Sequence, residues 1–149
     1  MYNKALVPTD GSINALLAIN FAADLLKIGI CKSVTLIHVV NISEEFSHFS
    51  IINTKRVDEE FIKSKLQNQG KQILAVSSEI FKQRDLSVDT IVELNDDPGD
   101  RIIKLSKEQK FDLIIMGKRG ISVMKEIILG SVSSKVLHNA ECPVIVYKG

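Results

Sequence analysis

Residues 111–117 have the sequence FDLIIMG, an almost uninterrupted apolar run that ends in glycine. Asp112 is its only charged residue. A run of this kind predicts a strand that is buried on both faces, as the strands of parallel sheets are. The stretch therefore predicts a sheet whose two faces are both covered by other parts of the chain.

Further strands and helices are predicted to alternate around this run. Apolar and β-branched residues predict strands over 4–9, 33–40, 86–94 and 142–149. Helical spacing and capping residues predict helices over 12–29, 54–83, from 98 onward and over 131–138. The order over 1–149 predicts a single α/β domain with a parallel sheet between two helical layers.

Two local predictions concern the segment between the predicted strands over 33–40 and 86–94. Residues 41–53 show neither helical nor strand periodicity, which predicts a long loop. The buried face of the helix that follows is predicted to carry Ile62, Leu66, Ile73, Val76 and Ile80.

Composition excludes several classes of protein. The 149 residues are 45% hydrophobic and 25% charged, as expected for one globular domain. The net charge of +1 argues against a nucleic-acid partner. No apolar run approaches the ~20 residues of a membrane span. The first residues lack the long apolar stretch of a signal peptide, so we expect a cytoplasmic protein with no membrane partner.

Common catalytic and cofactor motifs are absent from the sequence. It contains no CxxC, no HExxH, no GxxxxGK[ST] and no GxGxxG. A phosphoacceptor receiver domain has the same alternation, and Asp96 or Asp97 can imitate its acceptor, but the first strand is followed by only one of the acids that it needs. We assign no catalytic residue and no metal site made by the protein alone.

Ligands of parallel α/β sheets bind at the carboxyl ends of the strands. In this chain those ends carry four groups of residues, which are Pro8, Thr9 and Asp10, then Val39, Val40 and Asn41, then Asn95, Asp96 and Asp97, and finally Met116 and Gly117. Asp10 can accept hydrogen bonds from a ribose hydroxyl or a base amino group. The alternative is that Asp10 only caps the first helix.

Glycines and hydroxyls are spaced around the last helix in a way that suits a phosphate. Gly117 ends a strand, Gly120 follows it, and Gly130 and Ser131 open the helix, with Ser133 close behind. Glycine permits close backbone approach, and a helix start offers free N–H groups and partial positive charge. The open alternative is that these glycines only form turns and that Ser131 is an ordinary N-cap.

PTDGS at 8–12, LIHVV at 36–40, FDLIIMGKRG at 111–120 and GSVSSKVLHNAECPVIVYK at 130–148 together resemble the universal stress protein family. Its nucleotide signature G-x2-G-x9-G-[ST] matches Gly117, Gly120, Gly130 and Ser131. The resemblance implies a three-layer α/β sandwich with a five-stranded parallel sheet in the order 3-2-1-4-5. It also implies that ATP is bound, with Mg²⁺ or Mn²⁺ bridging the phosphates.

The resemblance assigns site residues one by one. It implies that Asp10 and the backbone of Val39 face the adenosine, with Pro8, Thr9 and Met116 beside it. The residues that it places around ribose and phosphates are Gly117, Arg119, Gly120, Gly130, Ser131, Val132 and Ser133.

The resemblance further implies a homodimer in which the last strand pairs with its twin. Val144 and Val146 offer an apolar edge for this pairing, although Lys148 can also shield a free edge. The expected function is a stress-response protein that binds ATP and acts as a sensor or switch on an unknown protein partner. The alternatives are a slow ATPase and a nucleotide-independent interaction module.

Overall fold

The computed structural model describes residues 1–52, 58–118 and 129–149 of the chain. Five parallel strands form one sheet in the order β3-β2-β1-β4-β5. The strands are β1 (Tyr2–Pro8), β2 (Cys31–Val40), β3 (Asp89–Leu94), β4 (Leu113–Gly117) and β5 (Val144–Tyr147). The predicted fold class and strand order are confirmed.

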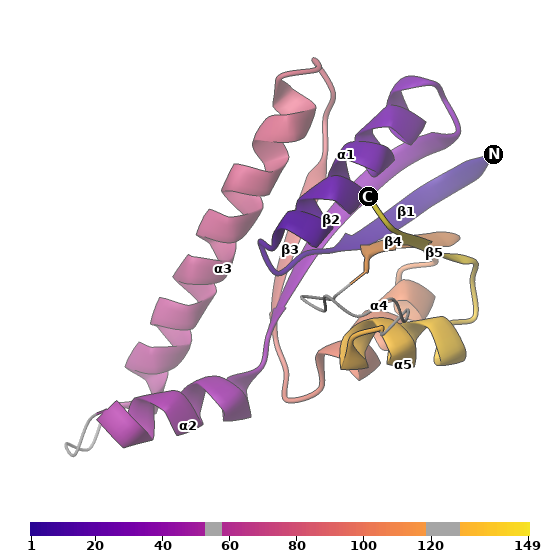
Figure 1. Ribbon diagram of the computed structural model, residues 1–149. Helices are drawn as coiled ribbons and strands as arrows, with labels where there is room; N and C mark the ends of the chain where they lie inside the picture. The colour runs from indigo at the N-terminus through magenta and orange to yellow at the C-terminus, as the bar shows by residue number, and fades with distance from the viewer. Residues whose placement is uncertain (53–57, 119–128) are drawn as a thin grey trace.

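Helices cover both faces of the sheet (Figure 1). One layer consists of α1 (Ile13–Lys27) and α3 (Glu59–Lys82), and the other of α4 (Pro98–Glu108) and α5 (Ser131–Asn139). The helix α2 (Ile42–Ile52) leaves the end of β2 and leads toward the start of α3. The predicted three-layer arrangement is therefore present.

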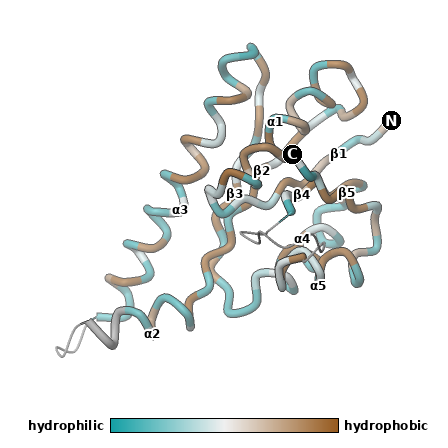
Figure 2. Tube along the Cα trace, in the orientation of Figure 1, coloured by the Kyte–Doolittle hydropathy of each residue, from teal (hydrophilic) through white to brown (hydrophobic). Residues whose placement is uncertain are grey.

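The core has two halves, one on each face of the sheet. Successive strand side chains point to opposite faces, so Ala5 and Val7 pack beneath α1 and α3, whereas Leu6 packs beneath α4 and α5. In β4, Ile115 and its neighbour Ile114 divide in the same way, and both are completely buried. Figure 2 shows hydrophobic colouring through the strands and alternating colours along the amphipathic α3. The unbroken apolar run in β4 is required because both of its faces are covered.

Residues 42–52 form the helix α2, so the prediction of a loop over 41–53 is wrong for these residues. The side chain of Asn41 accepts a hydrogen bond from the N–H of Glu44 at 3.1 Å, which caps the helix. Phe46 packs against a small cluster that contains Val40 and Leu66. Tertiary packing of one aromatic side chain thus stabilises a helix with a weak periodic pattern.

The helix α3 begins at Glu59 with Asp58 as its N-cap, and the predicted start near residue 54 lies outside the described residues. Val76 was expected on the buried face but is 68% exposed. The residues that the helix buries are Ile62, Leu66, Gly70, Leu74, Ser77 and Phe81.

Candidate functional site

A cavity of about 700 Å³ opens at the carboxyl ends of the strands. It lies where the strand order reverses between β1 and β4, the place at which open α/β sheets bind ligands. Its walls come from the ends of β1, β2 and β4, the start of α2, the first turns of α1 and α5, the middle of α3, and the connection from β3 to α4. Its size is typical of pockets that hold small organic ligands.

Hydrogen bonds hold the end of β1 in place beside this cavity. The N–H of Thr9 donates to the carbonyl oxygen of Ile37, and Nδ1 of His38 lies 2.8 Å from the carbonyl oxygen of Thr9. Because a carbonyl only accepts, His38 carries a proton on Nδ1. This bond joins β2 to the residue that precedes Asp10.

Asp10 stabilises the turn that follows β1. Its Oδ1 accepts a hydrogen bond from the N–H of Ser12 at 2.9 Å. The N-cap of α1 is Ser12, whose side chain accepts from the N–H of Ala15 at 3.2 Å. The alternative that Asp10 caps α1 is therefore wrong, and its exposed carboxylate lies in the cavity wall.

Among the described residues, no side chain forms a capping hydrogen bond at the start of α5. Gly130 is the N-cap, with φ −63° and ψ 161°, and no side chain bonds to the first turn from that position. Ser131 is the first helical residue, so the alternative in which Ser131 is the N-cap is wrong. The first N–H groups of a helix have no acceptor within the helix and carry partial positive charge. This turn therefore presents anion-binding groups to the cavity that Ser131 and Val132 line.

The start of α5 is joined to the end of β4. The hydroxyl of Ser133 donates a long hydrogen bond of 3.4 Å to the carbonyl oxygen of Gly117, and Ser133 is buried. This bond brings the segment that ends at Gly117 next to the segment that begins at Gly130.

The structure places most of the predicted site residues around one cavity. Gly130 directly precedes the cavity-lining Ser131, whereas Arg119 and Gly120 lie outside the described residues. The predicted residues that line the cavity are Pro8, Thr9, Asp10, Val39, Met116, Gly117, Ser131, Val132 and Ser133.

Sequence reasoning missed that residues 42–52 form a helix, and it missed the contribution of α5 beyond its first turn. Glu44 and Glu45 of α2 line the cavity. The N–H and hydroxyl of Ser43 donate to Oδ1 of Asp96, at 3.1 and 2.7 Å, which holds α2 against the connection between β3 and α4. The signal for α2 was the spacing of Asn41 and Glu44, which is that of a helix N-terminus.

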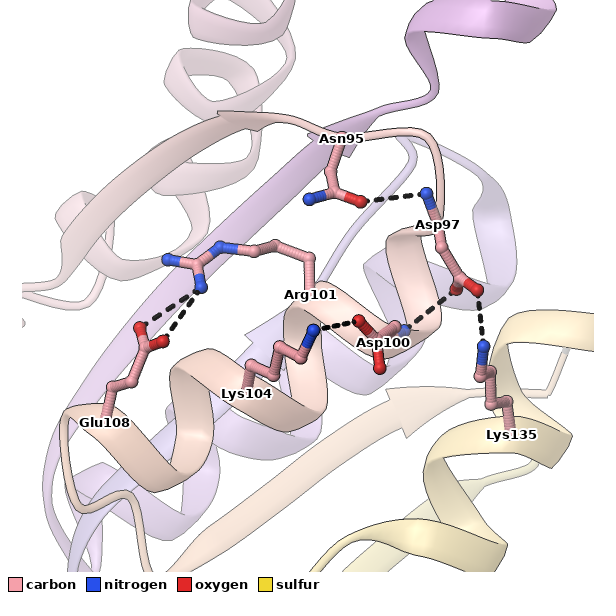
Figure 3. A network of polar contacts seen from close by, with 7 residues as sticks. All are labelled: Asn95, Asp97, Asp100, Arg101, Lys104, Glu108 and Lys135. Carbon is pink, nitrogen blue, oxygen red and sulfur yellow. Dashed lines mark hydrogen bonds and ion pairs between the residues drawn. The ribbon is translucent and has the colours of Figure 1, made fainter.

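Lys135 is the other missed residue, and it forms an ion pair with Asp97 across the cavity wall (Figure 3). Asp97 is also the N-cap of α4, where its Oδ1 accepts from the N–H of Asp100 at 2.9 Å. The hydrogen bond from Lys135, and then that from Asp100, lower the pKa of Asp97. The available signal was that Lys135 follows Ser131 by four residues and so shares its helix face.

Arg101 organises a second set of ion pairs outside the cavity. Its guanidinium bonds to Glu93 of β3 and to Glu108 at the end of α4, both at 3.1 Å. The bond to Glu93 is the main reason why the pKa of Arg101 is raised. Lys104 pairs with Asp100 on the same helix (Figure 3). These contacts hold α4 in position. None of the side chains that make them lines the cavity.

Within 1–52, 58–118 and 129–149, no three His, Cys, Asp or Glu side chains are grouped to hold a metal ion. No helix in these ranges is long and apolar enough to cross a membrane.

The sequence model of the universal stress protein family matches residues 1–148. The chain belongs to the universal stress protein family. Among its relatives is universal stress protein YxiE of Bacillus subtilis, which is 31% identical over 153 residues that cover 99% of this chain and 100% of YxiE. Universal stress protein MJ0577 of Methanocaldococcus jannaschii is 33% identical over 167 residues, which cover 99% and 96% of the two chains.

Solved structures of universal stress proteins have the same fold. The structure of MJ0577 superposes with a TM-score of 0.78 at 30% identity and covers 100% of this chain and 97% of its own. A universal stress protein from Archaeoglobus fulgidus in complex with dAMP superposes with a TM-score of 0.66 and covers 99% and 98%. At 21% identity the second likeness concerns the fold alone.

Proposed function

We propose that this universal stress protein binds ATP in the cytoplasm and acts as a nucleotide-dependent sensor or switch through a homodimer. The observation that carries the proposal is one cavity that is lined by the end of β1, the end of β4 and the start of α5, where the N-cap is a glycine. The complex of an Archaeoglobus fulgidus relative with dAMP supports an adenine nucleotide as the ligand class.

The adenosine occupies the part of the cavity next to β1 and β2 in this proposal. Asp10 accepts hydrogen bonds from the nucleoside, the backbone of Val39 contacts the base, and Pro8, Thr9 and Met116 line the same side. Val39 and Met116 supply apolar surface, and the carboxylate of Asp10 is exposed. An apolar wall with a few polar groups is the usual composition of a small-molecule site.

The ribose and phosphates occupy the part next to β4 and α5. The free N–H groups of the first turn of α5 and the hydroxyl of Ser131 donate to phosphate oxygens. The residues assigned to this part are Gly117, Gly130, Ser131, Val132 and Ser133, together with Arg119 and Gly120 from outside the described residues. Mg²⁺ or Mn²⁺ bound together with the nucleotide would offset part of the negative charge of the phosphates.

The switch works through surfaces at two ends of the molecule. β5 lies at one end of the sheet and pairs only with β4 among the described residues, so its free edge is available to a second copy. Val144 and Val146 belong to this strand. At the cavity mouth, Glu44 and Glu45 of α2 lie within reach of a bound nucleotide, and α2 offers a surface for a protein partner to recognise.

The first test is native mass spectrometry of the freshly purified protein, with identification of the extracted nucleotide by liquid chromatography. The proposal expects one adenine nucleotide per chain in a species of twice the chain mass. A protein that carries no nucleotide and refuses added ATP, ADP and AMP contradicts it.

Gly130→Val tests the placement of the phosphates. The backbone angles of Gly130 are accessible to valine, so the substitution crowds the phosphate position without backbone strain. We expect a loss of ATP affinity of at least tenfold by calorimetry. Ala140→Val is the control, because Ala140 ends the same helix with similar angles, φ −68° and ψ 142°. Unchanged affinity in Gly130→Val contradicts the assignment.

A further inference from the structure

The described wall of the cavity is strongly acidic. Asp10, Glu44, Glu45, Asp96 and Asp97 line it. Lys135 is the only lysine or arginine among the described residues that do so. A polyphosphate therefore meets five carboxylates and one ammonium group in this part of the wall. Because the attraction between opposite charges falls with distance, the affinity for any phosphorylated ligand depends on where that ammonium group lies.

Lys135 stands where it can reach the start of α5. It follows Ser131 by four residues, so the two side chains share one face of the helix. Side chains in helices lean toward the N-terminus. One helical turn rises about 5.4 Å, which an extended lysine side chain can span. The ammonium group can thus reach the level of the free N–H groups without a change in the helix.

The carbon chain of Lys135 is packed while its charged end is accessible. A Cβ on Gly99 would lie 3.0 Å from Cδ and 3.3 Å from Cβ of Lys135, so the absence of a side chain at Gly99 makes room for the lysine. The side chains of Lys135 and Asp97 are 40% and 51% exposed. An ion pair this exposed contributes little to stability, so its exchange for another anion is easy.

We propose that Lys135 selects phosphorylated ligands in this cavity, because its ammonium group leaves Asp97 and binds a phosphate group held at the start of α5. The inference rests on the proposed function and deepens it. It predicts that nucleotides bind more tightly than adenosine largely through Lys135, and that Asp97 competes with the phosphate for the same ammonium group.

Lys135→Met tests the inference, since methionine keeps most of the apolar chain over Gly99 and removes the charge. Calorimetric titrations compare ATP, AMP and adenosine. A lost charge-assisted hydrogen bond is expected to weaken ATP binding by roughly tenfold to a hundredfold. Adenosine affinity should stay within about twofold. Lys104→Met is the matched control, because Lys104 pairs with Asp100 outside the cavity and its loss should affect neither ligand.

Asp97→Asn distinguishes phosphate selection from a structural tie between α4 and α5. Asparagine can still cap α4 through its side-chain oxygen, but it no longer holds the ammonium group by charge. Competition predicts that Asp97→Asn strengthens ATP binding several-fold, whereas Lys135→Met weakens it. A structural tie predicts that both variants weaken binding.

The outcomes separate the inference from the proposed function. Unchanged ATP affinity in Lys135→Met, or equal losses for ATP and adenosine, overturns the inference and leaves the proposed function intact. A wild-type protein that binds neither adenosine nor any of its phosphates overturns both. Restoration of ATP selectivity by Lys135→Arg is expected if the charge is what matters.

Discussion

A methyl group on Gly117 would lie 2.3 Å from the carbonyl oxygen of Asn14 and 2.9 Å from the nitrogen of Ala15. The end of β4 therefore packs directly against the backbone of the first turn of α1. These segments are far apart in the sequence, and both line the cavity. The glycine at the end of β4 is required by this close approach, whether or not a nucleotide also needs it.

Gly117→Ala is expected to lower the free energy of unfolding by about 2–3 kcal/mol, because backbone atoms of α1 cannot move aside without displacing the helix. Urea denaturation followed by circular dichroism measures the change. Gly29→Ala is the control: Gly29 has φ +77° but open space around it, so it should lose only about 1 kcal/mol through backbone strain. A smaller loss for Gly117→Ala than for Gly29→Ala would disprove the packing argument.

Gly70→Ala is expected to destabilise the protein by about 1 kcal/mol even though alanine favours helices. The new Cβ would lie 2.9 Å from Cγ1 of Val92 and 3.1 Å from Cδ2 of His38, which is held by its bond to Thr9. The same denaturation experiment applies. Ser64→Ala is the control, since Ser64 is an exposed residue of α3 that should gain a few tenths of a kcal/mol. Equal gains in both variants would show that α3 does not press on the sheet at Gly70.

Removal of Lys135 is expected to raise the pKa of Asp97 toward the ordinary aspartate value. The Lys135 hydrogen bond is the main cause of the lowered pKa, and the N–H of Asp100 maintains part of the shift. Because the pKa is lower in the folded state, the stabilisation is present above the unfolded-state pKa of about 3.9 and is lost as the pH falls through the folded value. Carbon-13 NMR titration of Lys135→Met and of the control Lys104→Met measures the pKa of Asp97 in each variant. Identical titration of Asp97 in both variants would contradict the pairing.

Val146→Lys is expected to convert the proposed dimer into a monomer of 16.5 kDa. A charge in the four-residue strand β5 disfavours pairing of its free edge with a second copy. Analytical ultracentrifugation measures the mass, and circular dichroism checks the fold. Val76→Lys is the control, because Val76 is exposed on α3, away from β5. A wild-type monomer, or a Val146→Lys dimer, would refute pairing through β5.

The predictions from sequence succeeded where a local pattern of residues is compatible with only one local structure. The run at 111–117 is the buried strand β4, Ser12 caps α1 and Pro98 begins α4. The prediction failed at 42–52, where the helix depends on the packing of Phe46. It also failed at Val76, because the position of α3 on the sheet makes Leu74 and Ser77 the buried residues.

Some features of the candidate site could also be predicted from local sequence patterns, whereas others depend on tertiary contacts. Strand ends in a parallel sheet meet at one edge, so Asp10, Val39 and Met116 could be assigned to one cavity from the sequence. The pairing of Lys135 with Asp97, 38 residues away, could not be predicted, since it depends on how α4 and α5 pack.

The sequence by itself determined the alternation of strands and helices, the burial of the strands and the edge at which the cavity opens, because these follow from hydrophobic periodicity and chain direction. The tertiary structure alone decided that Gly117 faces the backbone of α1, that α2 borders the cavity and that Lys135 meets Asp97. Contacts of this second kind depend on the distance and angle between packed elements, which no local pattern of residues encodes.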